Sequence, residues 1–521
     1  MKNSNSKGDS LPADCQVASE LPLRNQGCSS CARGRSLGAS VLASALVLSG
    51  CAVGPNYQRV KVNSPAEFRG AEGAAQQASF ADLPWWEAFK DEELKALIKT
   101  ALANNYDLAI AVSRVEQARQ IAAQARAQYF PFVNYSVGAS DGKNEFLGSF
   151  APAGGAVTQG AFFAAASAAW EPDIWGRIRR LNESARAQYL STEEARRGVM
   201  LTLTANVAEA YFQLLGLELQ LEIAKETTAS FTNTYNLFMQ RYEGGVASKL
   251  DTSRADAAQA AAAATVPEYE RQIALQEDQI SVLLGQNPST IRHTAKLLNQ
   301  VVPPEIPVGL PSALLERRPD VLSAEQQVRA ANAQIGVATA NFFPQLGLTA
   351  LVGQASQPLS DITSGRGNVW SLAGNFTGPI FQGGLLRAQK RQAVASWEQS
   401  KLQYEQAALN AFTDVANALI SRQKYEAIRS EQARSVASYQ EAVQVALERY
   451  QAGKASYFEV LDAQIQLYPE ETALAQTETN RRVVIVQLYL ALGGGWNLTD
   501  ADWQNMTVTQ SAPGAPPKTN P

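Results

Sequence analysis

Residues 378–451 read GPIFQGGLLRAQKRQAVASWEQSKLQYEQAALNAFTDVANALISRQKYEAIRSEQARSVASYQEAVQVALERYQ, and no proline or glycine follows Gly384 in this stretch. Apolar or small residues recur three or four positions apart, which is the spacing of a helix and not of a strand. They include Val394, Trp397, Tyr404, Ala408, Ala411, Val415 and Leu419. About 70 residues would make a helix about 100 Å long, far longer than an ordinary globular helix. Such a length is typical of a coiled coil or of a tube of helices.

The chain carries an earlier near-copy of this stretch, which runs from Pro172 to Gly245. Matching landmarks recur 208 positions apart, at Arg241-Tyr242 and Arg449-Tyr450 and again at Leu284-Gly285 and Leu492-Gly493. Each half is predicted to contain a helix, two strands, a long helix, a tight turn and a returning helix. A duplication on this scale predicts one repeated architecture instead of three or four separate domains.

Alternation of apolar and polar residues predicts a pair of strands in each half. The expected strands are about 131–140 and 161–170, then 344–353 and 369–378. In the last of them, Trp370, Leu372 and Phe376 share one face, opposite Ser371, Asn375 and Thr377. Each strand has about ten residues, which is the length that a tilted transmembrane strand needs.

Four transmembrane strands cannot close a barrel within one chain. An open sheet edge in lipid leaves unpaired backbone groups, so several chains must contribute strands to one barrel. Two chains would supply eight strands, enough for a barrel filled by side chains. Three chains would supply twelve strands and leave room for a lumen.

The remaining boundaries follow from composition and from the positions of proline and glycine. Pro267 and Pro469 should kink or break the returning helices. The full division is a leader at 1–50, a tether at 51–83, a first repeat at 84–298 with its long helix at about 173–243, a proline-rich link at 299–311, a second repeat at 312–496 with its long helix at about 382–451, and a tail at 497–521.

The N-terminus has the features of a bacterial lipoprotein signal. Arginines precede an apolar run at 37–48 that is too short to span a membrane as a mature helix. The run ends Leu48-Ser-Gly-Cys51, which resembles the lipobox and implies a diacylglycerol on the thiol of Cys51 and an acyl chain on its amine. The alternative is an ordinary secretory signal with a chance cysteine. The pair Cys28 and Cys31 lies inside this leader, which disfavours a redox or zinc site.

Composition argues against several other classes of protein. A formal net charge of −4 provides no basic surface for nucleic acid. The single histidine, His293, excludes a multi-histidine metal site and is expected in a solvated loop. Gly453-Lys454 with Ser456 does not make a phosphate-binding loop, because Glu448 stands where the first glycine would be and a helix precedes it. We therefore expect no catalytic residue and no metal or other cofactor besides the lipid.

Several motifs resemble those of one family. Residues 51–57 (CAVGPNY) look like the mature start of lipoprotein outer membrane factors, and Trp85-Trp86 with Phe89 fits that family's early helix. The family's most specific internal signature is similar to Glu316-Arg-Arg-Pro-Asp320 followed by Ala324-Glu325 and Phe343-Pro344, and its C-terminal motif to residues 490–496 (LALGGGW). The resemblance covers about 51–496 and is to TolC-like exit ducts, near the multidrug and NodT-type branch.

This resemblance implies an α+β membrane protein that is a homotrimer. It implies a 12-stranded β-barrel in the bacterial outer membrane, continuous with a long α-helical barrel in the periplasm. The implied partners are outer-membrane lipid, a periplasmic adaptor (membrane fusion) protein and an inner-membrane pump of the RND type. The implied function is export of drugs or other small toxic molecules from the periplasm and the pump to the exterior. The alternatives are a type I protein-secretion duct and a non-conducting, lipid-anchored trimeric rod.

The resemblance also implies a periplasmic gate beside the second tight turn. The family's gate has a tyrosine before this turn and two acids after it, which match Tyr450, Glu459 and Asp462 here, and Phe458 stands where some members have an apolar constriction. Glu459 and Asp462 are three positions apart and therefore share one helix face. The alternative is a solvated acidic face, stabilised by the dipole at the start of a helix.

Both tight turns are expected to dock the adaptor, again by resemblance. The turn residues are Gly245, Val246, Ala247 and Ser248 in the first repeat and Gly453, Lys454, Ala455 and Ser456 in the second. A glycine at such a place also serves simply to end a helix. The repeats are not interchangeable, because Asp251 corresponds to Glu459 but Arg254 corresponds to Asp462.

Overall fold

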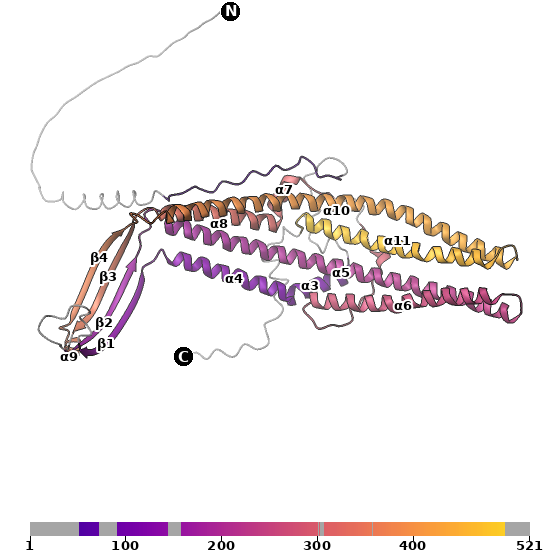
Figure 1. The fold of residues 1–521 in the computed structure, drawn as a ribbon, viewed down its shortest axis with the longest axis horizontal. Helices are drawn as coiled ribbons and strands as arrows, with labels where there is room; N and C mark the ends of the chain where they lie inside the picture. The colour runs from indigo at the N-terminus through magenta and orange to yellow at the C-terminus, as the bar shows by residue number, and fades with distance from the viewer. Residues whose placement is uncertain are drawn as a thin grey trace, which may run out of the picture. The chain divides into compact units, whose positions relative to one another are not determined.

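The computed structural model describes residues 52–71, 91–143, 158–300, 302, 307–356 and 358–494 (Figure 1). Four features expected from the sequence lie outside these residues. They are the leader with Cys51, the early motif Trp85-Trp86 with Phe89, Trp496 and the tail from 497.

Each repeat contains one long helix and one shorter helix that returns from it. The long helices are α5 (Arg177–Glu243) and α10 (Leu385–Gln451), each of 67 residues. The returning helices are α6 (Lys249–Leu283) and α11 (Tyr457–Ala491), each of 35 residues. The ends of all four helices keep the offset of 208 positions, so the duplicated architecture predicted from the sequence is confirmed.

Two further helices extend the returning helices towards the strands. They are α4 (Tyr106–Ala127) and α8 (Pro319–Ala340), which follow the shorter α3 (Glu92–Asn104) and α7 (Pro311–Arg317). Asn105 donates from Nδ2 to the carbonyl oxygen of Leu283 at 3.0 Å, and Arg318 donates from Nη1 to that of Ala491 at 3.1 Å. The last carbonyls of a helix have no partner within it, so these side chains satisfy them and join α6 to α4 and α11 to α8.

The helices form four rods that pack side by side. Two rods are the long helices α5 and α10, and the other two are α4 continued by α6 and α8 continued by α11. Helix α5 contacts both α4 and α6 of its own repeat and α8 and α11 of the other, and α10 contacts α8 and α11. The order across the rods is therefore α4 with α6, then α5, then α8 with α11, then α10 (Figure 1). The two repeats share one layer of helices instead of forming separate domains.

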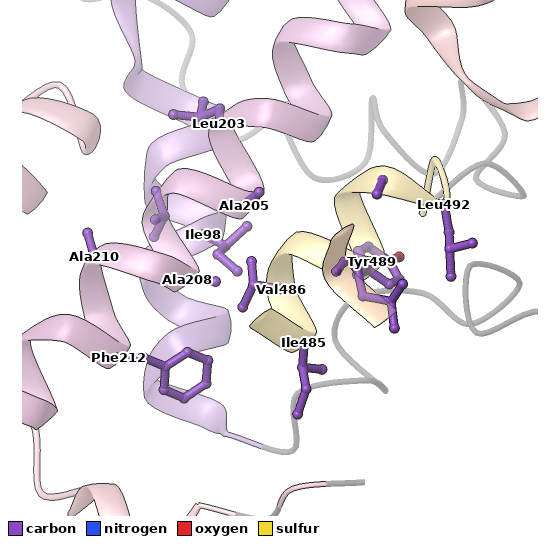
Figure 2. Close-up of a cluster of buried hydrophobic side chains, with 14 of the residues drawn as sticks. Ile98, Leu203, Ala205, Ala208, Ala210, Phe212, Ile485, Val486, Tyr489 and Leu492 are labelled. Carbon is purple, nitrogen blue, oxygen red and sulfur yellow. The ribbon is translucent and has the colours of Figure 1, made fainter. Parts of the chain in front are cut away.

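The main apolar core lies where α3, α5 and α11 meet. Figure 2 shows Ile98 of α3 beside Ala208 of α5 and Val486 of α11, and all three side chains are buried. Small residues let the helices approach closely: a Cβ atom added to Gly216 of α5 would lie 2.2 Å from Oγ1 of Thr479 on α11. Neither repeat could form this core alone, because α5 and α11 come from different repeats.

The strands form one antiparallel sheet in the order β1-β2-β3-β4. Their bounds are Phe132–Lys143, Thr158–Trp170, Gln345–Ser356 and Asn368–Thr377. The strands follow α4 and α8 and precede α5 and α10, so the sheet lies at one end of the helical rods (Figure 1). Among the residues that the structure describes, strands β1 and β4 each pair with only one neighbour, so both edges of the sheet are open in this part of one chain.

The register gives the sheet two different faces. Tyr135, Ala166, Val352 and Trp370 form one row across the four strands, and Val133, Ala168, Ala350 and Leu372 form another on the same face. Tyr135 is 86% exposed, Trp370 79% and Leu372 77%, so this apolar face is uncovered. The opposite face is mixed: one row holds Asn134, Ser167, Leu351 and Ser371, and Phe163 and Asn375 lie on the same side.

One expectation about the loops was wrong, and one about the helices holds only in its weaker form. Pro267 and Pro469 lie inside α6 and α11 and do not break them, while a kink at either proline stays a prediction. Each helix packs along its long neighbour, which offsets the one backbone hydrogen bond that proline removes. His293 is not a solvated loop residue, because its side chain is only 7% exposed and pairs with Glu218.

Among the described residues, no helix combines the length and the apolar character needed to cross a membrane.

Candidate gate at the helix tips

The two tight turns lie at the ends of the rods furthest from the sheet. Gly245 and Gly453 have φ angles of +72° and +68°, a left-handed conformation that glycine adopts without strain. The amide of Val246 donates to the carbonyl of Arg241 at 2.8 Å, and the amide of Lys454 donates to that of Arg449 at 2.9 Å. Both long helices therefore end by the same backbone hydrogen bond.

The helices that leave the two turns begin differently. Ser248 and Asp251 form a capping box at the start of α6, in which each side chain binds the other's backbone amide. Ser456 has the same extended conformation before α11 but makes no capping bond with its side chain. Glu459, which corresponds to Asp251, pairs instead with Arg449 at 3.7 Å. The second tip has thus exchanged a local cap for an ion pair between α10 and α11.

Tyr450 packs into a cluster of aromatic residues from both repeats. Its ring stacks on Phe238 of α5, with ring centroids 5.5 Å apart, and lies 6.2 Å from Tyr457 of α11. The guanidinium of Arg241 lies over the same ring, 4.5 Å from its centroid. The tip of the first long helix therefore holds the predicted gate tyrosine of the second.

Tyr457 is a part of this tip that the sequence analysis missed. It is buried against Phe238, with ring centroids only 3.7 Å apart, and its hydroxyl has no hydrogen-bond partner among the described residues. Burial, followed by the nearby Tyr450 and Asp251, raises the pKa of Tyr457 to about 12. The signal was available in the repeat alignment, because Tyr457 corresponds to Lys249 and is thus a tip position where the two halves differ.

The other predicted gate residues lie on the surface of the tip. Phe458 is 60% exposed, and Glu459 and Asp462 are also exposed. Asp462 makes no hydrogen bond or ion pair within the described part of one chain. A single chain therefore links Glu459 to the base of the turn through Arg449 but does not bring Asp462 to Tyr450. The free carboxylate and the exposed aromatic ring are available to a neighbouring chain.

The predicted docking residues are mostly exposed. Val246 is 80% exposed, and a Cβ atom on Gly245 or Gly453 would meet no atom within 4 Å. Ala247 is the exception in the first turn, because it packs against the tip cluster beneath. Each turn therefore presents a small, open surface on a rigid apolar base.

The internal signature that begins at Glu316 lies far from the tips, and its Arg318 links three helices. Arg318 binds Asp320 at 2.8 Å and Asp414 of α10 at 2.9 Å, and it also donates to the carbonyl of Ala491 at the end of α11. A cavity of about 1100 Å³ borders this network, and polar side chains of Thr202, Asn206 and Asn417 line part of it. In the part of the chain that the structure describes, no group of three or more His, Cys, Asp or Glu residues could hold a metal ion.

Several solved structures that resemble this one are outer-membrane channels. The family described as "Outer membrane efflux protein" matches residues 97–286 and 310–494. The chain is 33% identical to the cation efflux system protein CusC of Escherichia coli O6:H1, over 87% of this chain and 97% of that protein. It is 34% identical to the solvent efflux pump outer membrane protein SrpC of Pseudomonas putida, over 87% and 97%. The solved structure of the outer-membrane channel OprN superposes with a TM-score of 0.80 at 32% identity, covering 86% of this chain and all of that one.

Proposed function

Since this chain belongs to the outer membrane efflux protein family, we propose that it forms the outer-membrane exit duct of a tripartite efflux pump. One observation carries the proposal. A four-stranded sheet with two open edges lies at one end of four helical rods that pack side by side. Drugs or other small toxic molecules would leave the pump and the periplasm through this duct. The named relatives export cations and solvents, which favours this function over protein secretion or a non-conducting rod.

The open edges require further copies of the chain. Unpaired backbone groups in lipid cost several kcal/mol each, so β1 of one copy must pair with β4 of the next. Three copies supply twelve strands, and the twelve rods that continue from them make a helical tube. The apolar rows that include Tyr135 and Trp370 would face lipid, and the row with Asn134 and Ser371 would face the lumen.

The helical tube would carry cargo past a polar wall. The cavity lined by Thr202, Asn206 and Asn417 lies between rods of both repeats. Charged side chains of Asp107, Arg114 and Asp414 also line this cavity, so cargo would pass groups of both signs beside the amides and hydroxyls. A duct of this kind needs no catalytic group.

The gate would lie at the tips, where three copies of the second turn converge. Arg241 and Phe238 hold the ring of Tyr450 in place, and Asp462 is exposed on the same tip. Glu459 and Phe458 would complete the constriction. Like charges brought together around one axis repel, so the closed mouth would be easily opened.

The adaptor protein would dock on the eight turn residues of each chain and open this mouth. Exposure of Val246 and of both turn glycines supports that assignment. Cys51 would be acylated and would anchor the chain to the outer membrane, by the lipobox that precedes it. An inner-membrane pump of the RND type would supply the cargo.

Reconstitution tests the function directly. Purified protein should migrate as a trimer and should give discrete conductance steps in planar lipid bilayers, because a closed twelve-stranded barrel encloses a pore. Cells that lack it should accumulate more of a fluorescent pump substrate, and the gene should restore efflux. A folded trimer without any conductance would support the rod instead.

A further inference from the structure

The first described residues of the chain, 52–59, are bound by specific main-chain contacts. The amide of Val53 donates to the carbonyl of Trp175 at 3.0 Å, in the connection between β2 and α5. The buried side chain of Arg180, on the first turn of α5, donates to the carbonyls of Val53 at 3.4 Å and Gly54 at 3.3 Å, and to Oδ1 of Asn56 at 2.7 Å. One guanidinium thus binds three residues of this extended segment.

Glycines bring this segment into direct backbone contact with the helices. A Cβ atom on Gly54, whose φ is +96°, would lie 2.5 Å from Cα of Gly336 on α8. A Cβ atom on Gly336 would in turn lie 2.7 Å from Cγ of Arg180, and one on Gly176 would lie 2.6 Å from Cα of Ala52. Such contacts leave no room for the segment to slide along the helices.

The second repeat holds the same segment from the other side. Asn332 of α8 donates from Nδ2 to the carbonyl of Pro55 at 3.0 Å. The hydroxyl of Tyr57 donates to Glu325 at 3.1 Å, and Arg59 pairs with Glu316 at 3.0 Å and with Glu325 at 3.2 Å. Burial and the neighbouring Glu325 raise the pKa of Tyr57 to about 12, so its hydroxyl remains a donor. The acids of the internal signature therefore hold the start of the chain.

We propose that residues 52–59 are a clamp that fixes the start of the mature chain at the junction between strands and helices. The proposal rests on the proposed acylation of Cys51. Ala52 lies against Gly176, where β2 ends and α5 begins, so an acyl group on the preceding residue would start at the level where the strands end. The clamp would then set the depth of the lipid relative to the sheet and would join both repeats at that level.

The full chain allows a test in which every clamp residue is kept. A flexible Gly-Ser insert of about six residues between Cys51 and Ala52 adds up to roughly 20 Å of slack, a large part of the thickness of a bilayer's hydrocarbon core. The matched control places the same insert between Ala75 and Gln76, beyond the clamp. A second variant, Asn332→Ala, loosens the clamp and leaves the chain length unchanged.

Three readouts keep the outcomes separate. Palmitate incorporation reports acylation, hydrogen exchange at residues 53–59 reports the clamp, and yield of trimer in the outer membrane reports insertion. We expect the insert before Ala52 to lower trimer yield several-fold with normal palmitate incorporation and normal protection of 53–59, whereas the control insert leaves yield unchanged. Asn332→Ala should speed exchange at 53–59 and lower the yield.

Two results would overturn the proposal. One is a wild-type trimer yield with the insert before Ala52, and the other is fast exchange at residues 53–59 in the unmodified protein. Absence of palmitate in the unmodified protein would instead refute the acylation of Cys51. If residues 53–59 were still protected in that case, the clamp would hold no lipid, and the proposed role in setting the depth of the lipid would also be refuted.

Discussion

His293, the only histidine in the chain, ties a connecting segment to the first long helix. Its Nε2 lies 3.1 Å from Oε1 of Glu218, its Nδ1 lies 3.3 Å from the carbonyl oxygen of Ala295, and the ring meets Tyr211 edge-on. The hydrogen bond to Glu218 raises the pKa of His293 above its ordinary value. Nearby Glu93 binds the amides of Thr294 and Ala295 and adds to the negative charge around the ring.

This contact should respond to pH. A raised pKa in the folded state means that the charged pair stabilises the fold fully below the ordinary pKa of 6.5 and loses this effect as pH rises through the folded-state pKa. After correction for intrinsic exchange, amides at residues 291–295 should be better protected below pH 6.5 than well above it. Glu218→Gln should remove most of this difference. Glu222→Gln is the control, since Glu222 pairs with Lys296 and not with the histidine; equal pH responses in both variants would contradict the assignment.

At the scale of single elements, the two returning helices begin with the same serine in different roles. Ser248 closes a capping box with Asp251, whereas Ser456 makes no side-chain cap. Replacing a capping serine by alanine typically costs about 1 kcal/mol. The repeats therefore provide their own matched pair of variants.

Ser248→Ala should destabilise the start of α6 by about 1 kcal/mol, while Ser456→Ala should have little effect on α11. Hydrogen exchange of the first turn of each helix measures both effects locally. Equal losses at the two tips would show that Ser456 does form a cap in the assembled protein.

The sheet gives a second prediction at this scale. Trp370→Arg or Leu372→Arg should impair assembly far more than Asn375→Arg. A cationic residue on a lipid-facing strand position near the bilayer midplane costs about 2–4 kcal/mol, whereas the lumen face tolerates it. Yield of heat-resistant trimer in outer-membrane fractions compares the three variants. Similar yields would mean that the apolar face does not meet lipid.

At the scale of the whole molecule, the gate that we propose at Tyr450 and Asp462 can be tested with two conservative changes. Tyr450→Phe keeps the ring contacts with Arg241 and Phe238 and removes only the hydroxyl, and Asp462→Ala removes a carboxylate that has no partner among the described residues of one chain. Neither change should disturb the fold of a single chain. Any effect of the pair must therefore come from contacts between chains.

The double variant Tyr450→Phe with Asp462→Ala should conduct more than the wild type in planar bilayers and should admit large antibiotics into cells. The matched pair in the first repeat, Tyr242→Phe with Arg254→Ala, should do less because that half lacks the second acid. Wild-type conductance from both pairs would place the constriction elsewhere.

Several features of this protein are encoded locally in the sequence. The long helices follow from spacing of apolar residues around Tyr404 and Val415 and from the glycines that bound them. The strands and their two faces follow from alternation, and Trp370 and Asn375 lie on opposite sides as predicted. Turn glycines at 245 and 453 were recognisable because a left-handed residue at a helix end favours glycine. Each of these depends only on residues close together in the chain, so a periodic pattern is sufficient to reveal it.

The contacts that join the repeats could not be read in this way. Arg241 contacts the ring of Tyr450, and Tyr57 binds Glu325, which is 268 positions away. His293 is buried and binds Glu218. The sequence around these residues gives no sign of these partners. The sequence by itself determined the duplicated elements, their lengths and their apolar faces, because those are set by local backbone chemistry. Only the tertiary structure decided which repeat holds the predicted gate tyrosine and what holds the start of the chain, because packing two equivalent halves into one layer of helices brings distant residues within bonding distance.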